Sequence, residues 1–290
     1  MQRRGCLLGL ASAALAGCAF DVDSDHDGPD APRAAALPQL PRTAWVLSSG
    51  GPRGFVHVGV LKGLDELGLK PDLVVGASIG ALVGTLWAAG LPSHRIEALA
   101  LDLQPWTLAR LAPGAAERLS GAALRDWFAD HLPQRALQRL PVAAACVALR
   151  LSDREPVAFT QGDAALAVQA STAIEGRFAP VRIRGERYAD ADDRMPLPVR
   201  LARALGATRV LAVDASAHED RAPPGAERWR ESDRRKRDRI RPDAARADVL
   251  LHPDFGYWVD LSRAFRERAI GAGLQAVRDA APALRALHAG

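Results

Sequence analysis

The sequence has little cysteine, few aromatic residues and almost no excess charge. Three of its 290 residues are cysteine, and two of these, Cys6 and Cys18, fall within the first eighteen residues. Cys146 is then alone in the body of the chain, which excludes an internal disulfide there. Lysine and arginine exceed aspartate and glutamate by four, and so small an excess argues against a nucleic-acid partner. With 48% hydrophobic and 25% charged residues, the composition is that of a globular protein.

The first seventeen residues are not expected to belong to the fold. Two arginines precede an apolar run, Leu7–Leu15, which is too short to span a membrane and is typical of a signal peptide. The run ends in Leu-Ala-Gly-Cys, which resembles the lipobox of bacterial lipoproteins, where the cysteine is acylated. We therefore expect a lipoprotein signal peptide at 1–17 and a lipid anchor at Cys18; the alternative is an ordinary signal peptide with an incidental cysteine. Ala19, by resemblance to lipoprotein sorting, predicts the outer membrane of a Gram-negative cell.

Residues 18–43 are expected to tether that anchor to a domain at 44–290. They carry aspartates and prolines without a hydrophobic period, which indicates a solvated acidic spacer. The alternate aspartates of Asp23–Asp27 imitate the start of a calcium loop, but Ala34 stands where the closing glutamate of such a loop belongs. We therefore expect no metal site in this segment.

The body of the chain alternates between short apolar runs and helical patterns. Such alternation is typical of an α/β domain with a largely parallel sheet, so we expect a three-layer α/β/α fold. Helices broken by prolines are expected over 93–140. Strands are expected at 44–48, 73–75, 142–151, 157–160, 181–189, 208–215 and 248–251. Further helices are expected at 55–67, 79–89, 163–171, 198–205 and from about residue 260.

A serine between two glycines lies where the second expected strand meets a helix. In VVGASIGALVG, residues 74–84, Ser78 stands between Gly76 and Gly80. Paired glycines let a chain reverse sharply from strand into helix, and the residue at the apex of such a turn projects its side chain outward. This is the geometry of a nucleophile elbow, which makes Ser78 the candidate nucleophile. The five-residue pattern alone is too common to decide this.

A glycine-rich loop lies one strand–helix unit earlier. Ser-Ser-Gly-Gly-Pro-Arg-Gly at 48–54 joins the first expected strand to a helix N-terminus, where backbone amides and the helix dipole favour an anion. The loop lacks Gly-Lys-Ser/Thr, which disfavours nucleotide binding, and we expect no cofactor. Together with the elbow it predicts an oxyanion-stabilising loop formed by Gly50, Gly51, Arg53 and Gly54.

These motifs together resemble the patatin-like phospholipases. SSGGPRGFVHVGVLKGLDELGLKPDLVVGASIGALVG looks like the first block of that family, VQASTAIEGRFAPVRIRGERYADADDRMPLPVRLARALGATRVLAVDAS like the second, and ADVLLHPDFG like its closing strand. In that family a serine and an aspartate form a catalytic dyad without histidine. By position, the resemblance implies Ser78 as nucleophile and Asp190 as general base. It also implies a lipid acyl hydrolase that acts on phospholipids, lysophospholipids or other lipid esters through an acyl-enzyme.

Four positions depart from the family pattern. Ser49 replaces the first glycine of the loop, Glu175 replaces a proline, and Ala191 and Asp192 replace the small residues that follow the family's aspartate. Ala191 restricts the backbone more than glycine would. Asp192 places a second carboxylate near Asp190, which raises the pKa of one of the two. The departures leave open a domain that binds lipid as a scaffold without turning it over.

A Ser-His-Asp hydrolase is the other alternative, because histidines follow the serine and the acid in chain order. His252, in Leu-His-Pro at a strand end, is the best placed of them, whereas His57 is expected to pack near the glycine-rich loop. The stretch 228–241 has eight basic residues against three acidic ones; it is interpreted as a solvated insertion or as a contact with anionic headgroups. Aromatic residues of 93–140 are expected in the core or an acyl groove: Trp106, Trp127 and Phe128.

Overall fold

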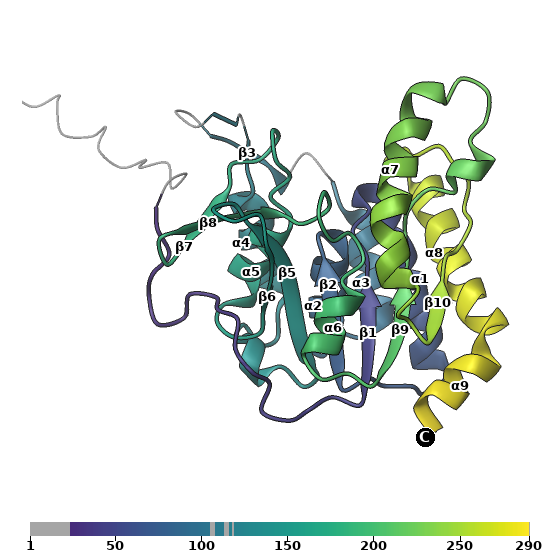
Figure 1. The fold of residues 1–290 in the computed structure, drawn as a ribbon, viewed down its shortest axis with the longest axis horizontal. Helices are drawn as coiled ribbons and strands as arrows, with labels where there is room; N and C mark the ends of the chain where they lie inside the picture. The colour runs from purple at the N-terminus through teal and green to yellow at the C-terminus, as the bar shows by residue number, and fades with distance from the viewer. Residues whose placement is uncertain (1–23, 105–107, 113–115, 118, 290) are drawn as a thin grey trace, which may run out of the picture.

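An eight-stranded sheet runs through the middle of the domain (Figure 1). The structure, a computed structural model, describes residues 24–104, 108–112, 116–117 and 119–289. The strand order is β10 (Val249–Leu251), β9 (Arg209–Val213), β1 (Thr43–Leu47), β2 (Leu73–Ala77), β5 (Ala143–Arg150), β8 (Glu186–Asp190) and β7 (Val181–Ile183), and β6 (Pro156–Phe159) also pairs with β5.

Most of the sheet is parallel, as predicted. Strands β10, β9, β1, β2 and β5 pair in parallel, so their carboxyl ends meet at one edge. The pairs β5–β6, β5–β8 and β7–β8 are antiparallel. In an open α/β sheet the edge formed by the carboxyl ends is where ligands bind, and Ser78 follows β2 at that edge.

Helices cover both faces of the sheet, which confirms the predicted α/β fold with helices flanking a central sheet. Along β1, Trp45 and Leu47 pack into one apolar core while Ala44 and Val46 pack into the other, as the alternation of side chains along a strand requires. The second core contains α6 (Val199–Ala204) and α7 (Glu227–Ala244), in front in Figure 1. The first core contains α1 (Phe55–Glu66), α2 (Ile79–Ala88), α3 (Ser93–Asp102), α4 (Ala122–His131), α5 (Ala164–Ser171), α8 (Arg263–Asp279) and α9 (Ala281–Ala289).

Helices α1 and α8 cross at unusually close range because glycines lie at the crossing. A Cβ atom on Gly59 would lie 1.8 Å from the carbonyl oxygen of Ile270, and one on Gly273 would lie 2.2 Å from that of Val56. Real Cβ atoms do not approach backbone oxygens this closely, so neither position accepts a larger side chain without separating the helices. The crossing holds α1, which begins at the glycine-rich loop, firmly on the sheet.

Three segments differ from their expected secondary structure. The region 93–140 contains a short antiparallel strand pair, β3 (Arg110–Leu111) with β4 (Leu119–Ser120), between its two longer helices. The extended stretch 181–189 is two strands joined by a turn at Arg184 and Gly185, both with positive φ. The charged stretch 228–241, expected only as a solvated insertion or a headgroup contact, is helical and lies within the 18-residue α7.

The segment expected to be a solvated spacer is attached to the domain where the structure describes it. His26 forms a bridge with Ile183, and the amide of Arg33 donates to the carbonyl of Gln161 at 3.0 Å. Ala31 is only 5% exposed. From residue 24 onward the chain therefore lies along the domain, because its backbone completes hydrogen bonds at β7 and the end of β6. The predicted signal peptide, Cys18 and the first aspartate of the calcium-like run lie outside the described residues.

Candidate active site

The pairing of β5 explains how two segments far apart in sequence meet at one point. β2 pairs with residues 143–147 of β5, and β8 pairs with residues 148–150. β6 pairs with residues 146–149, which overlap both sets. Since each edge of a strand accepts one neighbour at a time, β6 occupies one edge of β5, and β2 and β8 share the other. The carboxyl ends of β2 and β8 therefore meet head to head, which brings Ser78 against Asp190.

Ser78 occupies a strained turn between β2 and α2. Its φ of 54° and ψ of −123° are unusual for a residue with a side chain. A Cβ atom on Gly76 would lie 2.3 Å from the carbonyl oxygen of Gly80, and one on Gly80 would lie 2.3 Å from that of Leu47. Both glycines are thus needed for this sharp reversal. The Ser78 amide donates to Ser171 Oγ at 2.9 Å, a support from α5 that no local sequence signal indicates.

The side chains of Ser78 and Asp190 are in direct contact. Ser78 Oγ donates to Asp190 Oδ2 at 2.5 Å, and both residues are 6% exposed. Asp190 Oδ1 accepts the amide of Asp192 at 2.9 Å. Burial, reinforced by the negative charge of Asp192, raises the pKa of Asp190 to about 7. A carboxyl group with a pKa near neutrality, bonded to a hydroxyl, is suited to accept that hydroxyl's proton.

Two of the departures from the family pattern are in contact with each other. Ser49 Oγ donates to Asp192 Oδ1, and Lys236 Nζ donates to the same oxygen at 2.6 Å and contacts Ser49 Oγ at 3.2 Å. Burial opposes ionisation of Asp192, but the charge and hydrogen bond of Lys236, together with the Ser49 hydroxyl and the charge of Arg239, lower the pKa of that carboxyl. Lys236 belongs to α7. The acid next to Asp190 is therefore held ionised by a cation from the charged helix, which the sequence analysis did not identify.

The other two departures are accommodated without strain. Ala191 is fully buried in the second apolar core. Its φ is not positive, since the non-glycine residues with positive φ in the described chain are Ser78, Arg154 and Arg184. Its backbone therefore does not need glycine. Glu175 forms an ion pair with Arg154, with the carboxylate and the guanidinium 2.5 Å apart.

The glycine-rich loop presents one of its four predicted residues to the cavity. Gly51, with φ 52°, lines the cavity beside Ser78. Gly54 lies under Ile79, whose side chain leaves no room for a Cβ atom there. His57 is fully buried below the loop, as expected, with Nε2 2.9 Å from the carbonyl oxygen of Ser48. Burial lowers the pKa of His57 to about 4, so the ring is neutral and donates from Nε2.

Arg53 does not have the role expected from the sequence. Its amide donates to the carbonyl of Gly50 at 3.1 Å, so that N–H is not available to an oxyanion. Its guanidinium is turned away from Ser78 and donates to the carbonyls of Ala215, Gly256 and Tyr257 at 2.9 to 3.1 Å. Arg53 therefore joins the glycine-rich loop to the loop before α8.

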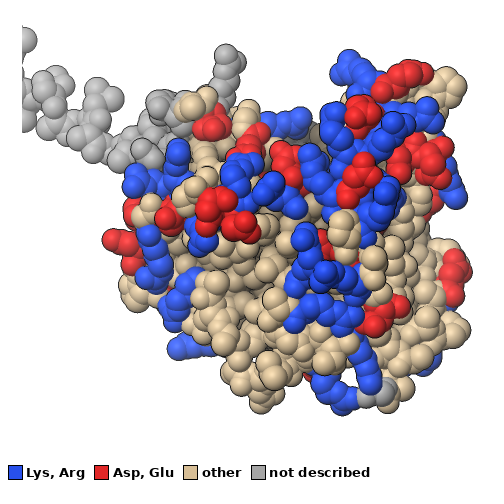
Figure 2. Space-filling view, viewed as in Figure 1, with Lys and Arg blue, Asp and Glu red and all other residues tan. Residues whose placement is uncertain are grey.

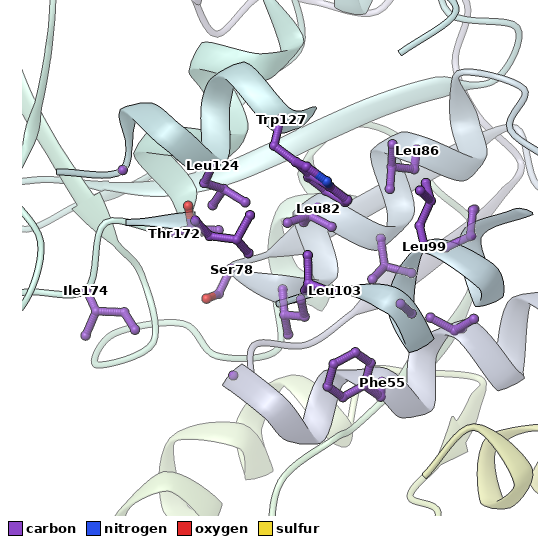
Figure 3. Close-up of a pocket in the computed structure, with 18 of the residues that line it drawn as sticks. Phe55, Ser78, Leu82, Leu86, Leu99, Leu103, Leu124, Trp127, Thr172 and Ile174 are labelled. Atoms are coloured by element: carbon purple, nitrogen blue, oxygen red, sulfur yellow. The ribbon is translucent and has the colours of Figure 1, made fainter. Parts of the chain in front are cut away.

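An apolar cavity of about 250 Å³ opens beside Ser78. Figure 3 shows Ile174 on one side of Ser78 and Leu82, Trp127 and Leu99 on the other. Trp127 thus lines a groove as expected, whereas Phe128 is fully buried in the core and Trp106 lies outside the described residues. The walls come from α1, α2, α3, α4 and the segment after α5, and nearly all are aliphatic or aromatic. Such a cavity fits a hydrocarbon chain whose polar end lies at Ser78.

His252 lies in a separate polar cluster and has no contact with Ser78. Its Nε2 lies 3.0 Å from the carbonyl oxygen of Ser216 and 3.8 Å from Asp214 Oδ2, and Arg237 donates to its Nδ1 at 3.0 Å. Its ring stacks on that of His218 with centroids 3.7 Å apart. The ring nitrogens are thus occupied, and His252 follows β10, which β9 and β1 separate from β2 and Ser78. Among the described residues, no three histidine, cysteine, aspartate or glutamate side chains lie together in a way that could hold a metal ion.

Comparisons with known proteins identify a matching family model and several relatives. The family model described as "Patatin-like phospholipase" matches residues 45–203. An uncharacterized NTE family protein of Mycobacterium tuberculosis is 34% identical over 185 residues, which cover 62% of this chain and 50% of that protein. The lysophospholipase nte1 of Neurospora crassa is 27% identical over 207 residues, covering 67% of this chain and 14% of that protein. The chain therefore spans about half the length of its mycobacterial relative, and far less of the fungal one.

Among solved structures, VipD from Legionella pneumophila aligns with a TM-score of 0.47 and 13% sequence identity. The alignment covers 92% of this chain and 71% of that one.

Proposed function

The chain belongs to the patatin-like phospholipase family, and from that premise we propose that it is a lipid acyl hydrolase with a Ser78–Asp190 dyad. The observation that carries the proposal is the 2.5 Å hydrogen bond from Ser78 Oγ to Asp190 Oδ2 beside an apolar cavity that Ser78 lines. A hydroxyl with a base attached and a hydrocarbon-sized space beside it is what hydrolysis of a fatty-acyl ester needs.

In the first half of the reaction, Asp190 takes the proton of Ser78 as Oγ attacks the ester carbonyl. The new Oγ–carbon bond converts the carbonyl into a tetrahedral oxyanion. When the carbonyl re-forms, the bond to the alcohol oxygen breaks, and the proton held by Asp190 passes to that oxygen. The acyl group is left on Ser78, with its chain in the apolar cavity.

The oxyanion would be stabilised by backbone amides on either side of Ser78. Gly51 lines the cavity beside the serine. At the start of α2 the amides of Ile79 and Gly80 have no intrahelical acceptor, whereas that of Ala81 already donates to the carbonyl of Ser78. The dipole of α2 adds partial positive charge at the same place. This set replaces the one predicted from the sequence, because the Arg53 amide is already bonded to Gly50.

In the second half, water attacks the acyl carbon and Asp190 accepts its proton. The tetrahedral intermediate forms again, Ser78 leaves with the proton returned by Asp190, and a fatty acid is released. One residue serves both halves, because a carboxyl with a pKa of about 7 exchanges a proton readily near neutral pH. Histidine has no part in either step.

We also propose that the domain acts at a membrane through an acylated Cys18, at the outer membrane of a Gram-negative cell. The proposal is supported only by the lipobox-like Leu-Ala-Gly-Cys at residues 15–18 and by Ala19. Among the described residues, no helix combines the length and hydrophobicity needed to cross a bilayer. Metabolic labelling with a clickable fatty acid should tag the wild type and miss Cys18→Ser; equal labelling of both would disprove the anchor.

The direct test of the activity is labelling of the full chain with a fluorophosphonate probe, followed by location of the adduct by mass spectrometry. We expect the adduct on Ser78, and hydrolysis of a short-chain ester and of a lysophospholipid by the unlabelled protein. Ser78→Ala should lose both labelling and hydrolysis. Ser216→Ala, which changes the serine beside His252, is the matched control and should retain both. An adduct on any other residue, or an unlabelled wild type, would contradict the proposal.

A further inference from the structure

A group of exposed apolar side chains lies at the start of α7 and on the loop that precedes α8. Trp229 is 41% exposed, Trp258 is 50%, Val259 is 42% and Leu261 is 47%. We call these four residues the aromatic rim. Scattered single apolar residues on a surface need no explanation, but a contiguous group containing two tryptophans marks a site of interaction.

The rim is an ordered surface. The rings of Trp229 and Trp258 meet edge to face with centroids 5.4 Å apart. Tyr257, next to Trp258, donates its hydroxyl to Asp233 Oδ2 at 2.5 Å, which joins the loop to α7. The guanidinium of Arg228 lies 4.1 Å from the centre of the Trp229 ring. Two indoles therefore stay together at the surface instead of packing into the core.

The rim is attached to the wall of the cavity at two points. Arg53, from the glycine-rich loop, donates to the carbonyls of Gly256 and Tyr257. Arg266 is 4% exposed, and it donates to the carbonyl of Leu261 at 3.0 Å and to that of Leu103, which lines the cavity, at 2.7 Å. Neither arginine lines the cavity, but each ties the loop to a segment that does, through Gly51 in one case and Leu103 in the other, so the rim keeps a fixed position beside the cavity.

Arginines outnumber acids on the α7 side of the rim, whereas the loop side carries Asp260 between Val259 and Leu261. Residues 228–235 contain four arginines and two acids. Of the two acids, Glu231 is shared between Arg234 and Arg235, and Asp233 is bonded to Tyr257. Figure 2 shows lysine and arginine side chains gathered over α7, with acidic ones between them.

We propose that the aromatic rim and the arginines of 228–235 form the surface by which the domain docks on a lipid bilayer, with the cavity facing the lipid. Indole rings prefer the interface between hydrocarbon and water, where the ring is buried and the N–H stays hydrated. Arginines beside them attract anionic headgroups. A protein partner would explain the apolar side chains equally well, but the position of the rim beside a hydrocarbon-sized cavity favours lipid. The inference rests on the proposed function for its occupant, and its test does not require turnover.

The test is co-sedimentation of the full chain, carrying Cys18→Ser so that no acyl anchor contributes, with vesicles of phosphatidylcholine alone or with phosphatidylglycerol added. We expect binding that is stronger to the anionic vesicles. Trp229→Ala with Trp258→Ala should lower the partition coefficient on the order of tenfold or more, given what burial of a large apolar side chain contributes. Val259→Glu is a second variant that changes no aromatic contact, and it should also weaken binding.

Leu40→Ala is the matched control, because Leu40 is 81% exposed but precedes β1, at the opposite end of the strands. It should leave binding unchanged. Equal partition of the parent and both rim variants into vesicles would overturn the proposal. A concentration-dependent dimer that the same variants abolish would also overturn it, because the rim would then serve self-association. Ser78→Ala should bind as the parent does. A parent protein that shows rim-dependent binding but hydrolyses no ester would refute the proposed activity alone.

Discussion

Two clusters of polar residues at the carboxyl edge of the sheet contain the same kinds of side chain, and only one of them has the properties of a catalytic site. In one, Ser78 meets Asp190 after β2 and β8; in the other, Ser216 and His252 lie near Asp214 after β9 and β10. Consecutive residues of α7 reach the two clusters: Lys236 contacts Asp192, and Arg237 contacts Asp214 at 3.0 Å.

The difference lies in where each cation is placed. Arg237 contacts Asp214 itself, so its positive charge directly balances the negative charge of that carboxylate. Lys236 contacts Asp192, the neighbour of Asp190, and the two oxygens of Asp190 accept only a hydroxyl and an amide. Within the described part of the chain, Asp190 thus has no cation in contact, and its partner Ser78 lines a cavity. A serine, an acid and a histidine near one another do not make a catalytic site; the acid must be free to take a proton where a substrate fits.

The largest expected effect is on turnover. Ser78→Ala should reduce ester hydrolysis to background, and Asp190→Asn should reduce kcat on the order of 10²- to 10⁴-fold, the usual contribution of a general base. His252→Ala in the other cluster should stay within about tenfold of wild type, since no step uses it. The measurement is steady-state hydrolysis of a short-chain ester. Inactive His252→Ala with active Asp190→Asn would assign the chemistry to a histidine instead.

The second expected effect is on stability and distinguishes the two cations. Arg237→Met leaves Asp214, which is fully buried, without its partner, and breaking a buried ion pair in this way costs about 3–5 kcal/mol. Lys236→Met leaves Asp192 near the surface, where the loss should be about 1 kcal/mol or less. Urea unfolding of the two variants checks this. Equal losses would mean that both cations serve the same structural purpose.

The parts of the site that sequence could predict are those determined by neighbouring residues. Apolar runs bounded by glycine and proline predicted β1, β2, α1 and α2. The pattern Gly-x-Ser-x-Gly predicted the elbow at Ser78, because its cause, the close approach of the two glycines, lies within five residues. The assignment of Asp190 came from the resemblance alone. The meeting of β2 and β8 depends on the long-range pairing of β5, which has no local signature.

The parts that sequence could not predict depend on long-range contacts of charged side chains. Arg53 was placed at the oxyanion because it stands in the loop, but its guanidinium finds three carbonyls more than 160 residues away. α7 has almost no apolar period, with Ile240 its one buried large apolar residue, so its pattern indicated a solvated segment. Its helical form is supported by ion pairs on the face that carries Lys236 and Arg237.

A third prediction tests the burial of Asp190 by stability. Its pKa is raised to about 7 from an ordinary value of 3.8, so the folded state binds the proton more tightly than the unfolded state. That contribution is fully present below pH 3.8 and is lost as the pH rises through 7. Asp190→Asn cannot ionise, so it should melt above the wild type at pH 8, on the order of a few degrees, and the gap should shrink towards pH 4. If the difference in melting temperature between Asp190→Asn and the wild type were the same at pH 8 and pH 4, the raised pKa would be contradicted.

The smallest expected effect is on the pH dependence of turnover, and it tests whether Lys236 acts on Asp190 through Asp192. With a base of pKa about 7, kcat/KM of the wild type should rise with pH and level off above 7.

Two charges besides its own face Asp190: Asp192 raises the pKa of Asp190 and Lys236 lowers it. Asp192→Asn should therefore move the rise to lower pH, and Lys236→Met should move it to higher pH, each by on the order of one pH unit. Asp193→Asn, whose side chain is 64% exposed and pairs with Arg239, is the control and should move it little. A loss of rate in Lys236→Met with an unmoved profile would assign Lys236 a purely structural role, whereas shifts of opposite sign in the two variants would show that the charged helix sets the proton affinity of the base.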